Sequence, residues 1–170
     1  MQKATKYTKA VNSKYPEQVV IAIARDAQGK DNPIAIGWTT ITSGDPPMMA
    51  IALGRGRYSL EAIRHSGEFV VAFPSREMAD DVLYYGSRSG RDTDKLADRA
   101  ARTEPATEVS TVLLSGAVAN FECQVAHEFE TGDHILVVGR VVASHTNADA
   151  DVKRLYTVGP GHVLRGVEPA

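Results

Sequence analysis

The sequence predicts a mainly β protein, in which antiparallel strands form a barrel and a few helices lie at its periphery. Residues 117–130 alternate between apolar and polar side chains, a period of two that is typical of a long strand. Other strand-like segments come in pairs separated by short turns, and no regular alternation of strands with helices is visible. A parallel sheet would need that alternation, so the pattern favours an antiparallel barrel.

The first three predicted strands lie in the N-terminal third of the chain. Residues 19–24 form a short β-branched run, and a turn over residues 26–30 separates it from a second strand over residues 33–41. Residues 48–53 predict a third strand, which is apolar enough to be buried on both faces.

Two helices are predicted next, with a strand between them. Ser59 has the features of an N-cap for the first helix, which is expected to end at Gly67. Residues 68–73 predict a strand, and Ser75 is expected to cap a second helix that extends to about Tyr85. The apolar face of the second helix is predicted to consist of Met78, Val82 and Tyr85.

The C-terminal half is dominated by a predicted hairpin. Residues 86–111 are polar and are expected to hold a turn, a short helix after Asp92 and a loop. In the strand over residues 117–130, odd-numbered side chains are predicted to face the core and even-numbered ones to be mostly exposed. Residues 131–133 predict a turn into a return strand over residues 134–144.

The length of 170 residues is expected to give one domain with a sizeable core over residues 15–159. Residues 1–14 are expected to form a flexible arm, and residues 160–170 a C-terminal tail on the surface or on a partner.

Composition argues against several classes of function. The net charge of −2 gives no electrostatic reason to expect nucleic acid or an anionic membrane as partner. The longest apolar runs have the length of a strand and the N-terminus lacks an apolar signal region, so we expect no membrane span or secretory signal. Cys123 is the only cysteine, which excludes an intrachain disulfide and makes a reducing cytoplasm the simplest location. The five histidines lack ligand-like spacing, so no metal site is expected.

The segment over residues 54–59 places two arginines, two glycines and a hydroxyl at a predicted helix start. Arg57, Ser59 and the free N–H groups that follow would together suit a phosphate dianion. Taken alone, the segment is more typical of a solvated surface turn with two exposed arginines and an ordinary N-cap. It has neither the P-loop pattern nor the glycine spacing of a dinucleotide fingerprint.

Residues 38–40 contain the only tryptophan and two threonines, and residues 45–47 form a rigid Asp-Pro-Pro turn. Backbone amides of an irregular strand there would suit the polar edge of a planar ring, and Trp38 would pack against that ring. The alternative is that Trp38 is a core aromatic residue and that the threonines are plain strand residues.

Two further segments carry candidate chemistry. Residues 87–95 are rich in charge: Lys95 would neutralise a bound anion, or Arg88 and Arg91 would receive a nucleotide phosphate. His134 starts the return strand of the hairpin, where it would donate a proton near neutral pH. The alternatives are a solvated loop with a helix cap and a hydrogen-bonded strand histidine.

Together and in this order, the motifs resemble the flavin reductase-like, FMN-binding split-barrel family, which includes flavoredoxins and NAD(P)H:flavin or ferric reductases. The matching residues are Asn32-Pro33, residues 37–40, Ser43 with residues 45–47, residues 57–59, residues 66–71, residues 89–95 and residues 132–134. The match covers roughly residues 15–145. Gly44, Ala72 and Leu96 depart from the family pattern, which affects details of the pocket rather than the fold.

The resemblance implies a six-stranded antiparallel Greek-key split β-barrel and an obligate homodimer, with one FMN per subunit near the interface. It implies that Arg57 and Ser59 hold the phosphate, and it suggests Lys95 and His134 as catalytic residues on the side where the electron donor or acceptor arrives. The complete set of expected cofactor-binding residues is Trp38, Thr39, Thr40, Ile41, Asp45, Pro46, Pro47, Arg55, Arg57, Tyr58, Ser59, Ser89 and Gly90.

The resemblance therefore predicts an FMN-dependent oxidoreductase. It would take hydride from NADH or NADPH and pass electrons to free flavin, a ferric chelate or a partner protein. The alternatives are a flavin-binding module that only relays electrons, and a scaffold on the same barrel that serves another ligand or partner.

Overall fold

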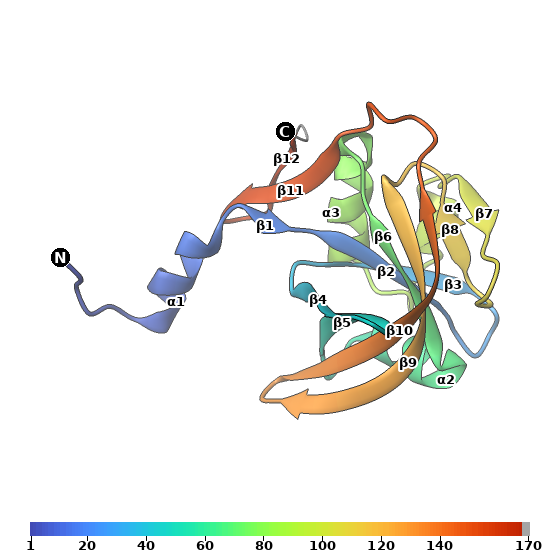
Figure 1. Cartoon of the computed structure of the whole chain (residues 1–170), viewed down its shortest axis with the longest axis horizontal. Helices are drawn as coiled ribbons and strands as arrows, with labels where there is room; N and C mark the ends of the chain where they lie inside the picture. The colour runs from blue at the N-terminus through green and yellow to red at the C-terminus, as the bar shows by residue number, and fades with distance from the viewer. Residues whose placement is uncertain (168–170) are drawn as a thin grey trace.

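Seven strands pair in one antiparallel sheet, in the order β3-β2-β6-β9-β10-β5-β4, in the computed structural model, which describes residues 1–167 (Figure 1). Two smaller sheets have the orders β1-β11-β12 and β7-β8. The strands are β1 (Glu17–Gln18), β2 (Val20–Arg25), β3 (Asp31–Ile36), β4 (Thr39–Gly44), β5 (Pro47–Gly54), β6 (Glu68–Phe73), β7 (Thr103–Pro105), β8 (Val112–Leu114), β9 (Ala119–Thr131), β10 (His134–Thr146), β11 (Arg154–Gly159) and β12 (Val163–Val167). The α-helices are α1 (Tyr7–Ala10), α2 (Tyr58–Ser66), α3 (Ala79–Ser87) and α4 (Lys95–Asp98), and the 3-10 helices are η1 (Val11–Lys14) and η2 (Arg76–Met78).

The main sheet confirms the mainly β class but not the strand count that the resemblance implies. The sheet has seven strands rather than six, and it is not closed. β3 and β4 follow each other along the chain, yet they form opposite edges of the sheet.

The prediction of a single strand over residues 33–41 is wrong, because this segment forms two strands, β3 and β4, in the structure. β3 pairs with β2, whereas β4 pairs with β5 at the other edge, so the chain crosses between the edges at Gly37 and Trp38. Gly37 suits the crossing because a Cβ there would lie 3.3 Å from the Glu17 carboxylate. Trp38 lies at this crossing and is about half exposed.

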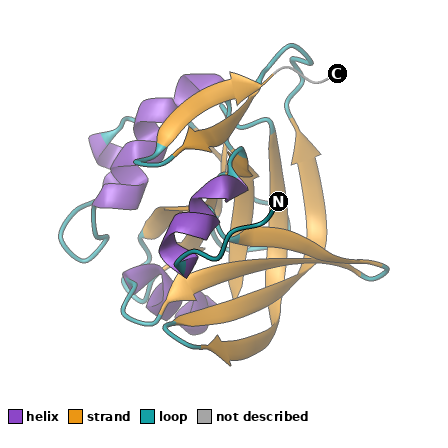
Figure 2. Ribbon diagram, turned by 90° about the vertical axis from the view of Figure 1, so that its left-hand side faces the viewer, coloured by secondary structure: helices purple, strands orange, loops and turns teal. Residues whose placement is uncertain are grey.

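The core consists of two apolar clusters on the two faces of β2. Even-numbered residues 20–24 belong to one cluster and odd-numbered residues 19–23 to the other, as the period of a strand requires. α2 covers the first cluster with Leu60 and Ile63, and α3 contributes Val82 and Tyr85 to the second. Full burial of each large apolar side chain is worth about 1.5–3 kcal/mol. Figure 2 shows the strong curvature of the main sheet.

The predicted faces of the long strand β9 hold only in part. Asn120 and Glu122, predicted to be mostly exposed, are buried. The loop before β8 folds over Glu122, and Asn120 exchanges hydrogen bonds with the backbone of Leu114 on β8. Beyond Val125, residues 126–131 are exposed on both faces. Only this end of β9 leaves the core, because the start of β10 lies between β9 and β5 and keeps Ile135 and Val137 buried.

The start of α2 differs from the prediction in a way that shapes the site. The helix begins at Tyr58 with Arg57 in the N-cap position, so Ser59 is not the N-cap but lies buried in the first turn. Gly67 ends the helix as predicted, with a φ of +72° that glycine tolerates.

The second predicted helix is confirmed as η2 followed by α3, with its predicted apolar face buried. Ser75 precedes η2 without a side-chain capping bond. The short helix predicted after Asp92 is α4, whose cap is Asp94, which accepts a hydrogen bond from the Ala97 N–H at 3.1 Å.

Both ends of the chain contribute structure. α1 and η1 contain no buried residue and extend away from the body (Figure 1). The predicted C-terminal tail instead contains β12, which pairs with β11; the part of the tail over residues 168–170 lies outside the described residues. Among residues 1–167, no helix has the length and apolar character to cross a membrane.

Candidate functional site

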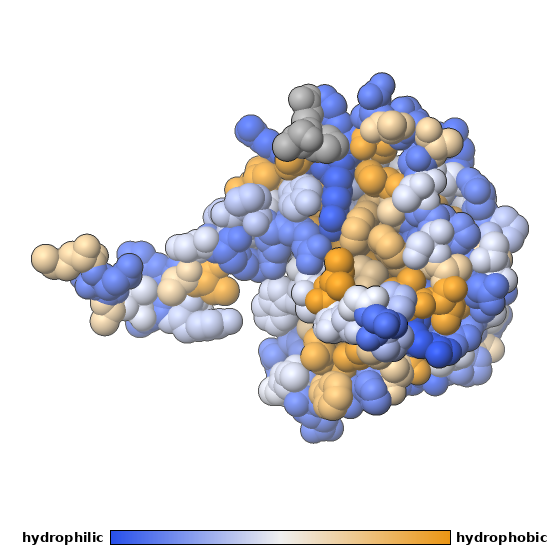
Figure 3. All heavy atoms as spheres, in the orientation of Figure 1, coloured by the Kyte–Doolittle hydropathy of each residue, from blue (hydrophilic) through white to orange (hydrophobic). Residues whose placement is uncertain are grey.

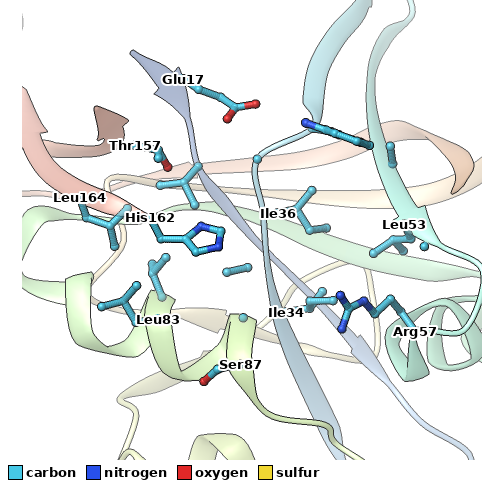
Figure 4. A pocket seen from close by; sticks show the side chains of 18 of the residues that line it. Glu17, Ile34, Ile36, Leu53, Arg57, Leu83, Ser87, Thr157, His162 and Leu164 are labelled. Atoms are coloured by element: carbon cyan, nitrogen blue, oxygen red, sulfur yellow. The ribbon is translucent and has the colours of Figure 1, made fainter. Parts of the chain in front are cut away.

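A cavity of about 720 Å³ opens between three parts of the chain (Figure 4). β3 and β5 form one wall, α3 forms a second, and segments near the two ends of the described chain form a third. Figure 4 shows Ile34, Ile36 and Leu53 on the first wall, Leu83 on the second and Leu164 on the third. Apolar side chains on three sides suit a flat, largely apolar group.

A smaller cavity of about 260 Å³ adjoins the first. The two cavities share Ile34, Arg57, Gly86 and Ser87. The rest of the smaller lining is mostly polar and basic: Gly56, Tyr58, Ser59, Tyr85, Arg88, Ser89, Gly90, Arg91 and Lys95. The pair forms a continuous site with an apolar end and a cationic end.

Arg57 lies at the junction of the two cavities, and the structure distinguishes it from Arg55. The Arg57 guanidinium forms no hydrogen bond or ion pair with any of residues 1–167. Arg55 lines neither cavity: its Nε donates to Gly132 O at 2.9 Å, and its Nη2 lies 3.2 Å from a Glu130 carboxylate oxygen. Arg57 is therefore available to a ligand, whereas Arg55 is bound to the β9–β10 hairpin.

Ser59 reaches the smaller cavity from the first turn of α2. It is buried, and its Oγ accepts a hydrogen bond from Asn32 Nδ2 on β3 at 2.8 Å. The N-terminal end of a helix carries free N–H groups and a partial positive charge, so this turn favours an anion. Tyr58, its neighbour, donates its hydroxyl to Asp26 at 2.8 Å.

Lys95 supplies a buried cation to the same cavity. Only 3% of Lys95 is exposed, and its Nζ lies 3.5 Å from the carbonyl oxygens of Tyr85 and Arg88. Burial, together with the charges of Lys30 and Arg57, lowers the pKa of Lys95 to about 8. In the described part of the chain, Lys95 has no ion pair with a carboxylate.

The loop that carries Ser89 and Gly90 is held in place from two sides. Lys30 Nζ donates to Gly90 O at 2.5 Å. Arg91 pairs with Glu61 of α2, which joins the loop to the helix. The loop thereby closes one side of the smaller cavity.

Trp38 and His134 meet at the opening of the larger cavity. Their ring centroids are 4.7 Å apart, and 48% of Trp38 is exposed. His134 Nδ1 lies 2.7 Å from Asp133 Oδ1, and this hydrogen bond lowers the pKa of Asp133. The alternative of a core tryptophan is wrong, because Trp38 is half exposed.

The remaining sequence-predicted residues lie on β4 and its turn, outside both cavities. Thr39 follows Trp38, but its hydroxyl donates to Ala50 O at 3.0 Å. Thr40 and Ile41 are exposed on the edge strand, and residues 45–47 form the turn into β5. The structure thus brings together Trp38, Arg57, Tyr58, Ser59, Ser89, Gly90, Lys95 and His134, and it leaves Thr39, Thr40, Ile41, Asp45, Pro46, Pro47 and Arg55 outside.

Residues 12–160 match the family model described as flavin reductase like domain. The chain belongs to this family. It is 28% identical over 153 residues to a flavin reductase of Pseudomonas putida, covering 90% of this chain and 86% of the relative. It is 30% identical over 113 residues to the NADH-dependent FMN reductase AsuE2 of Streptomyces nodosus subsp. asukaensis, covering 66% of this chain and 60% of the relative.

A solved structure shares the fold of this chain over its whole length. The crystal structure of an FMN-binding protein from Thermus thermophilus, with bound p-hydroxybenzaldehyde, superposes with a TM-score of 0.85 at 25% identity. The superposition covers 100% of this chain and 97% of that protein.

Two parts of the site in this flavin reductase-like domain were not predicted from the sequence. In the sequence Asn32 is only part of a motif, and nothing there indicates its contact with Ser59. The wall that includes His162 and Leu164 was predicted to be a tail. The alternation of exposed and partly buried side chains along β12 is the pattern that would have indicated a strand there.

Proposed function

We propose that this flavin reductase-like chain binds FMN and works as an NAD(P)H-dependent flavin or ferric reductase, or as an electron carrier of the flavoredoxin type. The observation that carries the proposal is the pair of joined cavities, one apolar with an aromatic opening and one cationic. FMN has the matching division into a planar ring and a phosphate. The names of the relatives, a flavin reductase and an NADH-dependent FMN reductase, support the same chemistry.

The smaller cavity fits a phosphate dianion by its donor set. Arg57 offers a guanidinium without a partner in the described chain, and Lys95 offers a buried ammonium. Ser59 adds a hydroxyl at the start of a nine-residue helix. We therefore assign the phosphate to this cavity and give Lys95 the role of its counter-charge.

The larger cavity fits the ring. Ile34 and Leu53 would pack against its apolar faces, and Trp38 would cover its exposed edge. The backbone of Thr39 to Ile41 and the turn over residues 45–47 continue from Trp38 along β4, where they would meet the polar edge of a ring that extends beyond the opening.

Bound FMN supplies the redox chemistry, by accepting hydride from NADH or NADPH and passing electrons to a small-molecule acceptor or partner protein. The chain's contribution is to orient the ring, to exclude water from its inner face and to hold charge. His134 is placed to hold a proton at the cavity opening, with Asp133 fixing its Nδ1 side.

We also propose that the protein is a homodimer. The support is two exposed apolar side chains on the main sheet: Ile41, 71% exposed on β4, and Phe129, 51% exposed near the end of β9. Figure 3 shows apolar side chains reaching the surface of the body beside a mostly polar arm. A sedimentation mass of one chain at micromolar concentration would exclude the dimer.

We place this protein in the cytoplasm, where its single, buried thiol at Cys123 would stay reduced.

The test of the cofactor compares two arginines that lie two residues apart. Arg57→Ala is expected to weaken FMN binding by about 10- to 100-fold, because it removes a charged donor to the phosphate. Arg55→Ala, the matched control, is expected to leave FMN affinity within about two-fold, since Arg55 contacts only the hairpin. Titration of the dialysed protein, followed by FMN fluorescence, measures both.

Equal FMN affinity in the Arg57 variant and the wild type would remove the phosphate assignment. Reduction of the bound flavin by NADH or NADPH without oxygen would then separate the two activities. A flavin that bleaches rapidly supports a reductase, whereas one that binds without bleaching supports an electron relay.

A further inference from the structure

Asn32 is a buried amide between the two walls of the smaller cavity. It lies on β3 with only 1% of its surface exposed. Its Nδ2 donates to Ser59 Oγ at 2.8 Å, and Ser59 belongs to the first turn of α2. Buried amides are normally hydrogen-bonded on both ends, yet Asn32 Oδ1 has no donor in the described structure.

The bond from Asn32 determines what the Ser59 hydroxyl can do. A serine hydroxyl donates one hydrogen bond and accepts up to two. The Asn32 amide N–H donates to one of the acceptor positions of Ser59 Oγ. The amide nitrogen cannot accept a hydrogen bond, so it cannot take the Ser59 hydroxyl hydrogen. The Ser59 hydroxyl makes no other hydrogen bond to residues 1–167, so its hydrogen is free to point into the cavity that it lines.

The same amide packs against the opposite wall at Gly90. A Cβ on Gly90 would lie 2.0 Å from Asn32 Oδ1 and 2.7 Å from its Cγ, so no larger residue fits beside Asn32. Lys30 fixes the loop by donating to the Gly90 carbonyl oxygen. Asn32 thus spans the distance between the start of α2 and the loop that carries Ser89 and Gly90.

We propose that Asn32 is a positioning residue for the phosphate of the bound flavin. It keeps the Ser59 hydroxyl as a donor toward the phosphate, and it sets the separation between that hydroxyl and the Gly90 loop. The inference rests on the proposed binding of FMN. It goes further because it assigns a role to a side chain that lines neither cavity and acts only through Ser59 and Gly90.

The experiment measures the affinities of FMN and riboflavin, which differ only by the phosphate, for the wild type and for Asn32→Ala, Ser59→Ala and the double variant. Asn32→Ala is expected to reduce FMN affinity about tenfold and to leave riboflavin affinity within about two-fold. In the double variant the two losses are expected not to multiply, because both act on one hydrogen bond. Asn12→Ala, on the exposed arm, is the matched control.

A purely structural role for Asn32 predicts a different result, namely equal loss of FMN and riboflavin affinity. That result, or losses that multiply in the double variant, would overturn the proposal. Gly90→Ala is a second route if Asn32→Ala fails to fold, because it displaces Asn32 without changing the amide or the hydroxyl. It is expected to lower FMN affinity selectively, and unchanged FMN affinity would contradict the proposal.

The outcome also separates this inference from the proposed function. A wild type that binds neither flavin would end the proposal of FMN binding itself. A wild type that prefers FMN, with Asn32 variants that keep the same preference, would end only the role of Asn32.

Discussion

Glu122 and Lys95 are both buried and charged, but they differ in the partners that surround the charge. The Glu122 carboxylate accepts hydrogen bonds from the N–H groups of Thr107, Glu108 and Val109 at 2.6–3.0 Å. Thr107 Oγ1 adds another donor, and His145 Nε2 lies 2.6 Å away. The Glu122 carboxylate therefore has its hydrogen-bond partners within the chain and needs no ligand.

Burial alone would raise the pKa of Glu122, but these donors outweigh burial and lower the pKa to about 2. Around Lys95 the balance is reversed, because burial and two neighbouring cations lower its pKa to about 8. Among residues 1–167, the hydrogen-bond partners of its Nζ are two carbonyl oxygens at 3.5 Å. A buried charge whose partners are all within the chain supports the fold, whereas one that lacks a counter-charge indicates a place for a ligand.

The largest effect is expected at Glu122. Glu122→Ala would leave several buried N–H groups without an acceptor and is expected to destabilise the fold by about 3–5 kcal/mol. Urea unfolding measures this loss. Glu128→Ala on the same strand, which removes only a surface pair with Arg64, is the matched control and is expected to cost under about 1 kcal/mol. Similar losses of unfolding free energy in the two variants would contradict the view that the Glu122 carboxylate supports the fold.

Acid titration tests the same carboxylate without creating a cavity. The pKa of Glu122 is lower in the folded state than its ordinary value of 4.5, so its stabilising effect is complete above that value. The effect is lost as the pH falls from about 4.5 to about 2, where the folded carboxyl becomes protonated. Glu122→Gln is expected to flatten this part of the stability curve, and an unchanged slope would show that other carboxylates determine it.

Lys95 is expected to show the opposite pattern, with a smaller effect on the fold. Lys95→Met removes a buried charge that has no carboxylate partner, so stability is expected to stay the same or rise by about 1–2 kcal/mol. FMN affinity is expected to fall about tenfold or more, since the phosphate loses a counter-charge. The matched control is Lys9→Met on the exposed arm. A variant with lower stability and unchanged FMN affinity would reverse the assignment.

The same two residues illustrate what could be predicted from the sequence. Strand alternation correctly located β9, whereas the anion site suggested by the residue types around Arg57 and Lys95 stays a prediction. The burial of Glu122 could not be predicted, because it depends on a loop 13 to 15 residues earlier that folds back over the strand. A local period reports the two faces of a strand but not what covers each face.

Contacts between distant segments were the other part that the sequence did not indicate. Asn32 and Gly90 meet because β3 and the loop after α3 lie side by side, which no local pattern encodes. The division of residues 33–41 at Gly37 and Trp38 also depended on the tertiary structure, since each half of the segment is a good strand by itself.

The smallest expected effect is a dependence of FMN binding on pH, with Lys95 as its source. The folded pKa of Lys95, about 8, lies below its ordinary value of 10.5, so the ammonium loses its proton as the pH rises through about 8 in the ligand-free chain. A phosphate monoester has its second pKa near 6 and is a dianion throughout this range. FMN affinity is therefore expected to fall several-fold between about pH 7 and pH 9, while riboflavin affinity stays level.

Lys95→Met decides whether this dependence comes from Lys95, because the variant cannot titrate and is expected to bind FMN weakly but equally at both pH values. The ligand-free chain supplies an independent check of sign. The unfolded chain holds the Lys95 proton up to about pH 10.5 and the folded chain only to about 8, so wild-type stability is expected to rise relative to Lys95→Met across that interval. A pH dependence of FMN affinity that persists in the variant would show that another group titrates. Lys95 would then have no role as the titrating counter-charge of the phosphate.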